Sequence, residues 1–530
     1  MTDEVDDPQI AAFNGWAKAN DACELPNLIL PSDDVTISEC ASKLFGYIAP
    51  NMRLFVRGGA VMRLVTREDG LLALEVLNPN AARSLIEKFC RPFAWRSGAN
   101  RERVLKPTIC SHDHAQALLN SEEAFKILPH VSGLLNCPVL TNIGKELVVV
   151  GRGYDESTKL LITGGENVPE VPLENAVVDL LSLVDEFDFQ TTSDKSRAVA
   201  SFITPALKSG GFLKRPVPAD VAEADASQSG KTFRQKLTVA MYNERLSLIS
   251  NRTGGVGSVD ESLNQALVSG KPFIQYDNFR GKLDTAHLEA FMTAEGSFSC
   301  RVPYRGEIYV QPDKFFIFLS SNGVDTTRDF ANRSNIIRIK KKPPGFAYTQ
   351  FEEGDLLDRV QHWQSYYLGC VFSVIRQWHR QGMQRTGETR HDFREWVQVV
   401  DWIVQNIFKL APVMDGHQNA QERVSNPQMV WLRQLVLTIH NTGETGRQLT
   451  ATDLQRICES ADIAIPGLRS EADELKASRV IGTIMGKLFG TRNELDFEGF
   501  AVVRGEKSVL RPNTLAGGGY QVKFYEVKQA

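Results

Sequence analysis

Apolar residues in the middle of the chain alternate between runs typical of strands and segments typical of helices. Short apolar runs occupy 245–250, 272–277 and 314–319, and segments of helix-forming composition occupy 233–244 and 258–268. Strands that alternate with helices are typical of a parallel sheet with crossover connections. The pattern therefore predicts an α/β domain built around a parallel sheet.

Shorter alternating runs precede this region. Residues 54–65 and 72–77 are predicted to pair as strands around a glycine turn, with a helix at 80–90 and a further strand at 146–150. Residues 111–114 contain two histidines, but no further ligands stand at a suitable spacing, so we expect a polar loop and no metal site. The first region is thus predicted to be a small α/β module.

Helical patterns flank the predicted sheet domain on both sides. Before it, helices are expected at 173–187 and 194–207, with Asp194 as the N-cap of the second. After it, helices at 356–377 and 392–409 are expected to form a lid. The tryptophans of this region are predicted to anchor its core, and not to serve as nucleic-acid platforms: Trp378, Trp396 and Trp402.

The last part of the chain has the pattern of a separate unit. Helices are predicted at 450–460 and 477–489, and strands at 500–504 and 520–527. Helices that precede a two-stranded ribbon are typical of a winged helix. The predicted units, in chain order, are an amino-terminal α/β module (1–165), a helical connector (166–212), the sheet domain (213–345), a helical lid (346–446) and a winged-helix domain (447–530).

The composition is that of an ordinary globular chain, with 42% hydrophobic and 23% charged residues and a net charge of −4. This charge argues against a protein that coats nucleic acid with its whole surface, but it allows a locally basic groove. The eight cysteines include no Cys-x-x-Cys pair, which favours reduced thiols and a cytoplasmic location. No signal peptide or membrane-spanning run is expected.

The stretch Asp-Ala-Ser-Gln-Ser-Gly-Lys-Thr at 225–232 carries the clearest chemistry. Backbone N–H groups at the start of a helix can surround phosphates, a lysine adds positive charge, and a following hydroxyl can bind Mg²⁺. The pattern usually begins with Gly where this chain has Asp225, and a lysine in so short a motif can also be an ordinary surface residue. The predicted ATP-binding residues are Ser227, Gln228, Ser229, Gly230, Lys231 and Thr232.

Two polar strand ends follow this loop at regular spacing. Asp277 lies 46 residues after Lys231, and Asn322 lies 45 residues after Asp277. In an open α/β sheet, ligands bind at the carboxyl ends of the strands. We therefore expect Asp277 to bind metal together with Thr232, and Asn322 to face the same crevice.

These motifs resemble those of AAA+ ATPases, and within that family the predicted ATPases and replicative helicases of phages and integrated mobile elements. The resemblance rests on 225–232, 254–278 and 321–333, and looser similarity touches most of the chain. It implies ATP and Mg²⁺ as cofactors, and it makes Asn322 a polar sensor of the nucleotide.

The resemblance also implies an arginine finger that reaches into a neighbouring subunit. Arg333 is the first candidate and Arg328 the second, and a solvated helix end is the alternative for both. AAA+ enzymes usually have Glu after the metal-site Asp, whereas this chain has Asn278. An amide can orient water but cannot accept its proton. Hydrolysis is therefore expected to be slow, or to use another base, for which the candidates are Asp277, Asp284 and Glu289.

Two regions are predicted to contact DNA. Residues 298–310 alternate like a β-hairpin, and in the helicase branch of AAA+ proteins a hairpin at this place lines a channel that grips single-stranded DNA. A solvated turn with a structural tyrosine is the alternative. From 477 onward, eight Lys/Arg against five Asp/Glu leave a mild excess of +3, which fits DNA contact or protein docking. The candidate DNA-binding residues are Arg301, Tyr304, Arg305, Arg479, Lys487 and Arg504.

The motifs and the resemblance together predict a DNA helicase that hydrolyses ATP between the subunits of a ring, with a hexamer expected. Single-stranded or forked DNA is the predicted partner, replication proteins are candidate partners, and no primase signature accompanies the motifs. The alternative is a nucleotide-dependent scaffold without unwinding activity, such as a helicase loader or a defence-system switch. Asn278 and the modest basic charge favour that alternative.

Overall fold

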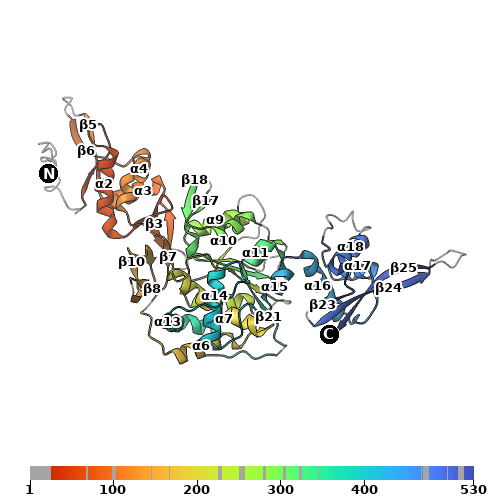
Figure 1. The fold of residues 1–530 in the computed structure, drawn as a ribbon. Helices are drawn as coiled ribbons and strands as arrows, with labels where there is room; N and C mark the ends of the chain where they lie inside the picture. Colours follow the sequence, from red (N-terminus) through yellow and green to blue (C-terminus); the bar gives the residue numbers. More distant parts are fainter. Residues whose placement is uncertain are drawn as a thin grey trace.

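The computed structural model describes residues 25–529 except 67–69, 98–102, 145, 166, 225–228, 250–256, 278–281, 284, 303–305, 322–324, 344, 467, 469–476, 498 and 511–518. An amino-terminal module, a central sheet domain and a carboxyl-terminal body follow one another along the molecule (Figure 1). The module and the carboxyl-terminal body lie on opposite sides of the central domain.

The central sheet has six strands among the described residues, in the order β12-β21-β13-β19-β15-β14. The parallel strands are β21 (Ser334–Lys340), β13 (Ala219–Glu223), β19 (Phe316–Ser321), β15 (Phe273–Tyr276) and β14 (Ser247–Leu248). At one edge, β12 (Asp188–Phe189) runs antiparallel beside β21. The predicted parallel α/β sheet is therefore confirmed, and the apolar runs that predicted it lie in β14, β15 and β19.

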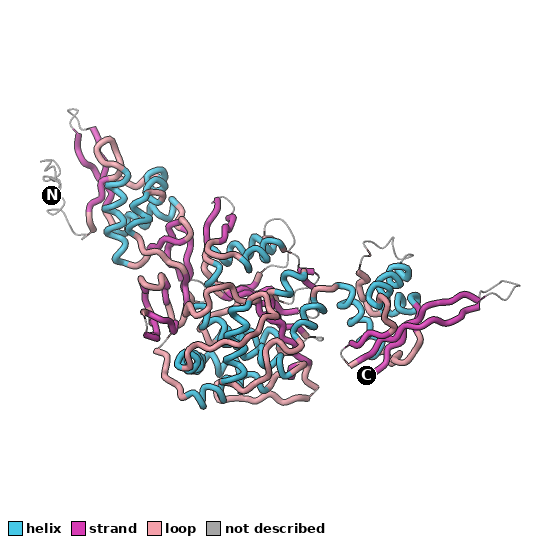
Figure 2. The backbone as a smooth tube through the Cα atoms, viewed as in Figure 1, coloured by secondary structure: helices cyan, strands magenta, loops and turns pink. Residues whose placement is uncertain are grey.

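Side chains of the sheet alternate between two hydrophobic cores, because successive residues of a strand point to opposite faces. In β19, Phe316 and Phe318 join one core, whereas Ile317 and Leu319 join the other. The helices that contribute to the first core are α6 (Leu173–Asp185), α7 (Thr192–Ser209), α8 (Lys231–Ala240), α12 (Leu356–His362), α13 (Gln364–Arg380) and α14 (Arg394–Asn406). Those of the second are α9 (Val259–Val268), α10 (Ala286–Thr293), α11 (Arg328–Asn332) and α15 (His417–Val424). Helices thus cover both faces of the strands (Figure 2).

The helices predicted as a lid share the first core with the helices predicted as a connector. Trp378 and Trp396 are each 1% exposed in this core, and Trp402 packs against it, which confirms their predicted structural role. Helices α12–α14 therefore form part of the layer that covers the sheet. The division into a connector and a lid stays a prediction.

The start of α7 differs in detail from the expected one. Thr191 is the N-cap, and Asp194 occupies the third helical position, where its carboxylate accepts from the Thr191 backbone N–H and closes a capping box. The prediction of Asp194 as the N-cap was wrong. Asp194 is buried and also pairs with Arg197 at 2.6 Å, so its carboxylate links the N-cap residue to the second turn of α7.

The amino-terminal module contains a cluster of short helices and strands that pair mostly antiparallel, with the parallel pairs β1–β5 and β7–β11. Its helices are α2 (Ile37–Ile48), α3 (Pro79–Phe89), α4 (His112–Leu119) and α5 (Glu122–Ile127). Its strands are β1 (Asn27–Ile29), β2 (Leu54–Arg57), β3 (Ala60–Thr66), β4 (Leu72–Val76), β5 (Arg91–Ser97), β6 (Arg103–Pro107), β7 (Gly133–Leu135), β8 (Val139–Ile143), β9 (Glu146–Val150), β10 (Gly153–Asp155) and β11 (Leu160–Ile162). The predicted pairing around the glycine turn is confirmed by β2 and β3. Ser111 caps α4, so the predicted polar loop at 111–114 was wrong, and no metal-binding group of His, Cys, Asp or Glu occurs in the described part of the chain.

The carboxyl-terminal body packs three helices on an antiparallel sheet. The helices are α16 (Pro427–Asn441), α17 (Ala451–Ser460) and α18 (Ala477–Phe489), and the sheet order is β22 (Leu449–Thr450), β25 (Gly519–Gln529), β24 (Phe500–Leu510) and β23 (Glu494–Phe497). Trp431 and Leu435 of α16 lie in this core. The body therefore includes α16, which precedes the predicted boundary at 447.

Within the described ranges, all seven cysteines are free and buried. No helix found there is both long and apolar enough to cross a membrane.

A pair of buried histidines joins β21 to the loop before α14 and to the start of α15. The rings of His391 and His417 lie 5.6 Å apart between centroids, and the Ile336 N–H donates to His417 Nε2 at 3.1 Å. The Phe393 N–H donates to His391 Nδ1 at 3.0 Å. Both rings are therefore held by acceptor nitrogens, which require the neutral imidazole. Burial lowers the pKa of His391 to about 4, and burial also lowers the pKa of His417 well below its ordinary value.

This pair predicts that the central domain loses stability as the pH falls below 6.5. A histidine whose folded-state pKa is depressed costs nothing above its unfolded pKa of about 6.5, but below it the unfolded chain binds the proton first. His391 alone should lower the free energy of unfolding by about 2 kcal/mol at pH 5, since the loss is about 1.4 kcal/mol per pH unit. Urea unfolding at pH 7 and pH 5 measures this difference, and equal stability at the two values would contradict it.

Candidate nucleotide site

The predicted phosphate loop joins the end of β13 to the start of α8. Gly230 occupies the cap position with φ of +89°, a left-handed conformation that favours glycine, and its added Cβ would meet the ring of Phe187 at 3.0 Å. The first backbone N–H groups of α8, which have no partner within the helix, therefore lie directly after the loop, where they can bind an anion. Ser229 Oγ is buried with no hydrogen-bond partner among the described residues. Ser227 and Gln228 lie outside the described residues.

The carboxyl ends of three strands bring the predicted metal ligands together. Asp277 follows β15, and its Oδ1 accepts from Thr232 Oγ1 at 2.9 Å and from Ser320 Oγ at 2.6 Å. Because Tyr276 pairs with Leu319 in the parallel register, Asp277 arrives beside Ser320. Hard oxygen ligands of this kind fit Mg²⁺, which is usually held by one or two protein groups together with phosphates and water.

Sequence reasoning missed Ser320 as a member of this group. The signal available was its place as the first polar residue after an apolar strand, but contact with Asp277 depends on the register between β15 and β19.

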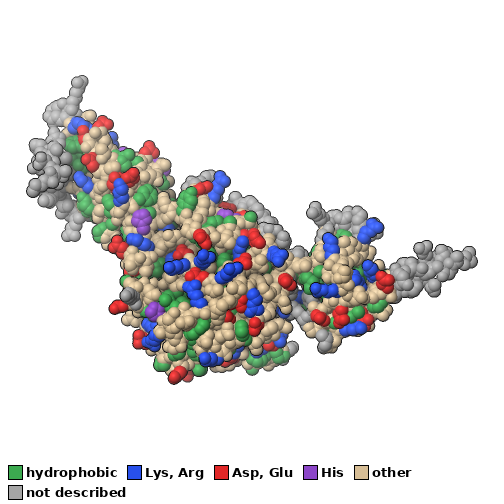
Figure 3. All heavy atoms as spheres, in the orientation of Figure 1, with side chains coloured by type: hydrophobic (Ala, Val, Ile, Leu, Met, Phe, Trp, Pro, Cys, Tyr) green, Lys and Arg blue, Asp and Glu red, His purple; other side chains and the backbone are tan. Residues whose placement is uncertain are grey.

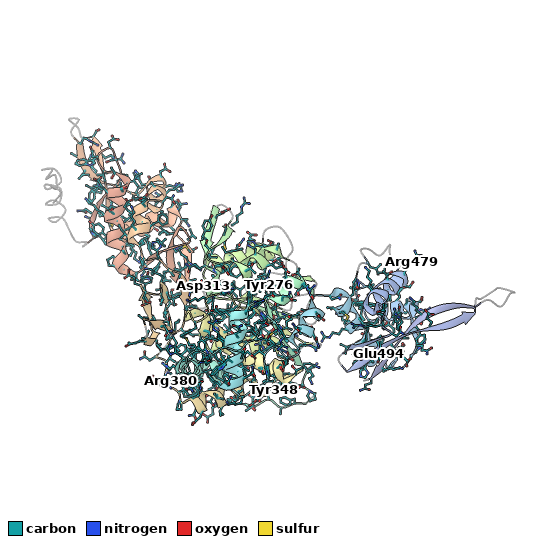
Figure 4. The ribbon with its side chains drawn as sticks, viewed as in Figure 1. Tyr276, Asp313, Tyr348, Arg380, Arg479 and Glu494 are labelled. Atoms are coloured by element: carbon teal, nitrogen blue, oxygen red, sulfur yellow. The ribbon has the colours of Figure 1, made fainter. Side chains whose placement is uncertain are left out.

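Lys231 lies beside the same group. Its side chain is 8% exposed, and burial lowers its pKa, while Asp277 and Glu223 act in the opposite direction. The predicted lysine and carboxylate are therefore neighbours at this edge of the sheet. Tyr276, which directly precedes Asp277, is labelled in Figure 4.

A buried polar network fixes α8 against the strands. Arg234 and Asp220 form an ion pair with side chains 0% and 9% exposed. Gln235 Nε2 donates to Asp220 O at 3.1 Å and to Leu319 O at 3.1 Å, and Gln275 Nε2 donates to Gln235 Oε1 at 3.0 Å. One helix residue thus bonds to three adjacent strands, which sets the place where α8 begins.

Glu223 ends β13 and connects the site to the carboxyl-terminal body. Arg433 of α16 lies 2.8 Å from Glu223 Oε1, and Arg338 of β21 lies 3.6 Å from Glu223 Oε2. All three side chains are less than a tenth exposed. Sequence reasoning missed this group, because Arg433 stands 210 residues from Glu223 and no local pattern links them.

Half-buried aromatic rings border the loop on the side of β12. The rings of Phe187 and Phe233 lie 6.4 Å apart, and those of Phe187 and Phe189 lie 6.0 Å apart. The rings are apolar surface within reach of the first turn of α8. Such a surface is suited to the base of a nucleotide.

Several predicted catalytic residues are not placed. Asn278, Asp284 and Asn322 lie outside the described residues, so their roles stay predictions. Glu289 is on α10, where its carboxylate accepts a hydrogen bond from Thr327, the N-cap of α11.

Of the two predicted arginine fingers, Arg333 lies at the amino ends of the sheet strands. Arg328 begins α11 and is exposed, and Arg333 follows that helix, 3.6 Å from Asp329. The Ala219 N–H donates to Arg333 O at 3.1 Å, which places Arg333 beside the start of β13, whereas the phosphate loop follows its end. Arg333 is therefore not arranged to act on the loop of its own chain.

The predicted DNA-binding residues are distributed over two bodies. The hairpin is confirmed as β17 (Phe298–Val302) and β18 (Gly306–Val310), with Arg301 exposed and paired in register with Glu307; Tyr304 and Arg305 lie outside the described residues. Arg479, labelled in Figure 4, and Lys487 are exposed on α18. Arg504 instead lies over the Phe489 ring and donates to Arg492 O at 2.8 Å. On the face drawn in Figure 3, acidic and basic side chains are mixed over the central domain.

No protein-family model matches the chain, and no curated protein matches it. Solved structures match weakly. The C-terminal region of NrS-1 has a TM-score of 0.32 at 10% identity over 78% of this chain and 91% of that chain. The active helicase Cch of SCCmec type IV has a TM-score of 0.29 at 10% identity over 89% and 97%. The JCV helicase has a TM-score of 0.21 at 11% identity over 47% and 72%. Such low scores carry no argument about this chain, whose own residues must support any function.

The buried pair beneath α8 yields a stability prediction. Asp220→Ala should lower the free energy of unfolding by about 3 kcal/mol or more, because it leaves the Arg234 charge buried without its carboxylate. Glu122→Ala, which removes one partner of the exposed pair with Lys126 (2.7 Å), is the control and should cost less than about 1 kcal/mol. Urea unfolding of both variants measures the difference, and equal costs would refute the structural role of Asp220.

Proposed function

We propose that the chain is an ATPase of the AAA+ type that binds ATP with Mg²⁺ at the carboxyl edge of the central sheet. The observation that carries this proposal is that Lys231 and Thr232 of α8 meet Asp277, which follows β15, at one place. The triphosphate lies at the start of α8, where backbone N–H groups and Lys231 offset its charge. Thr232 and Asp277 hold the metal, which neutralises charge on the phosphates when bound.

The water that attacks the terminal phosphate needs orientation and a proton acceptor. Asn278 can provide only the first. Hydrolysis by this chain is therefore slow, or it depends on a carboxylate that accepts the proton, for which Asp277, Asp284 and Glu289 are the candidates. Asn322 is the proposed sensor at the end of β19.

Oligomerisation follows from the separation of the two sheet edges. Arg333 stands beside the amino end of β13, so it reaches a phosphate only when a second copy presents the carboxyl ends of its strands to it, and Arg328 is the second candidate for the same role. A head-to-tail contact of this kind closes into a ring when its rotation allows. A hexameric ring is the assembly that the resemblance to AAA+ proteins favours.

DNA is the proposed partner of the ring. The hairpin β17–β18 presents Arg301, and the proposed winged helix of the carboxyl-terminal body presents Arg479 and Lys487 from α18. Cations on exposed hairpins and helices bind the phosphates of single strands in a salt-dependent way. The function we infer is a helicase or translocase of the kind that phages or mobile elements use for replication.

A nucleotide-dependent scaffold is the second candidate. It is favoured by Asn278 in the position of the usual glutamate and by the mixed charge of the surface, since both fit a protein that binds ATP and changes partners without unwinding DNA.

The nucleotide site is tested by the lysine. Lys231→Ala should lower ATP turnover by about 10²-fold or more, since it removes the charge that faces the phosphates. Lys236→Ala is the matched control, because Lys236 is an exposed lysine of the same helix and should leave turnover unchanged. Steady-state ATPase rates measure both. Unchanged turnover in Lys231→Ala would refute the site.

The hairpin separates the motor from the scaffold. For a motor, single-stranded DNA should stimulate ATP hydrolysis, and Arg301→Ala should reduce that stimulation about fivefold or more, whereas Glu307→Ala on the opposite strand should not. ATPase rates across a series of oligonucleotide concentrations, with strand displacement on a fork, provide the measurement. Nucleotide-dependent assembly without stimulation or displacement would instead identify a scaffold.

A further inference from the structure

The turn between β2 and β3 of the amino-terminal module reaches the hairpin of the central domain. Gly58 of this turn has φ of +58°, and its carbonyl accepts from the Tyr309 N–H of β18 at 3.2 Å. A Cβ on Gly58 would lie 1.9 Å from Tyr309 O. No real side chain tolerates that distance, so the backbones of the turn and of the hairpin approach in a way that only glycine permits.

The preceding residue extends the same contact into the central domain. Arg57 is 4% exposed, and its Nη1 donates to the carbonyl of Val268, the last residue of α9, at 3.1 Å. Its guanidinium also lies over the Phe315 ring, 5.7 Å from the centroid. A cation at the end of a helix meets the unsatisfied carbonyls and the negative end of the helix dipole. Arg57 therefore fastens the module to the end of α9.

This buried cation is poorly explained by stability alone. Its Nε and Nη2 have no hydrogen-bond partner within the described part of the chain, and burial lowers its pKa to about 10. An arginine buried in this way costs desolvation that one carbonyl and one aromatic ring repay only in part. What the contact does accomplish is geometric, because it joins the turn to α9, to β18 and to the residue that precedes β19.

The hairpin is also supported by the second core and by α9, from which Asn264 Nδ2 donates to Arg301 O at 3.5 Å. On one face, Phe298, Cys300, Ile308 and Val310 pack into the second core of the sheet domain. Ser299, Arg301, Glu307 and Tyr309 alternate with them and belong to the other face. β17 and β18 pair only with each other within the described residues, so the Gly58 turn is the neighbour that approaches the backbone of β18.

We propose that the Arg57–Gly58 turn is a positioning element, which holds the hairpin β17–β18 in the place where it receives single-stranded DNA. The inference rests on the proposed function of the hairpin, and it gives the amino-terminal module a task in DNA engagement. The turn contacts the central domain near the amino ends of β15 and β19, whereas the phosphate loop lies at the carboxyl ends of the sheet strands. ATP binding and basal hydrolysis therefore do not require the turn to be seated.

Two adjacent glycines provide a matched test. Gly58→Ala and Gly59→Ala both place alanine at a left-handed φ, +58° and +80°, but a Cβ on Gly59 meets nothing within 4 Å. The strain within the turn is therefore shared, and only Gly58→Ala collides with the hairpin. Amide hydrogen exchange of Tyr309 should accelerate in Gly58→Ala and remain as in the wild type in Gly59→Ala.

The functional readout is the concentration of a single-stranded oligothymidylate that gives half-maximal ATPase stimulation. It should rise about fivefold or more in Gly58→Ala, with the basal rate and the KM for ATP unchanged, and stay constant in Gly59→Ala. Accelerated exchange with unchanged DNA dependence would overturn the proposal, and so would equal exchange in the two variants. If the wild-type chain shows no stimulation, the proposed function fails, and the exchange data still decide whether the turn anchors the hairpin.

A second variant covers the case in which Gly58→Ala does not fold. Arg57→Met keeps the apolar stem against Phe315 but removes the bond to Val268 O. The half-maximal oligothymidylate concentration should rise in this variant, and its Tm should not fall, because the replaced cation has no carboxylate partner among the described residues. A lowered Tm with normal DNA dependence would show that Arg57 is merely structural.

Discussion

The hydrogen bonds of Asp277 to Thr232 and Ser320 are the constraint on which the site depends. Asp277 follows β15, whereas Thr232 belongs to the helix that follows β13, and β19 lies between those two strands. The carboxylate can meet the hydroxyl only if the parallel registers on both sides of β19 are kept. The geometry of the site is therefore set by the hydrophobic cores that hold β19 in place, because these cores fix the strands to within the length of a hydrogen bond.

The parts of this arrangement that have a local signature could be predicted from the sequence. Lys231 and Thr232 follow a glycine at a helix start, Asp277 follows an apolar strand, and their order along the chain fits a crossover sheet. Ser320 also follows an apolar run, but its contact with Asp277 depends on the register between β15 and β19, which the sequence does not show. The ion pair between Arg433 and Glu223 joins positions 210 residues apart, and a single sequence contains no pattern that would bring them together.

The assignment of helices to layers shows the same limit. Helix-forming composition indicated the helices at 356–377 and 392–409, which the structure has as α12 with α13 and as α14, but it did not indicate α15 or α16. An apolar pattern gives only the direction of an apolar face and not the surface that this face will cover. Trp378 and Trp396 pack in one core with the helices α6 and α7, and Trp431 of α16 packs in another. Each helix packs where its apolar face buries the most area, and that choice depends on all the surfaces of the folded domain and not on the helix sequence alone.

The carboxyl ends and the amino ends of the central strands contact different parts of the molecule. The carboxyl ends of the strands hold Lys231 and Asp277, and there Glu223 pairs with Arg433 of the carboxyl-terminal body. The amino edge is contacted by Arg57, through the end of α9 and Phe315, so the position of the amino-terminal module bears on the same strands from the other side. Strands that are packed between two cores bend little, so a shift at one end reaches the other end mainly when the strand moves as a rigid element. Coupling between nucleotide and hairpin would therefore have to pass through rigid-body movement of β15 and β19, whose ends touch both sites.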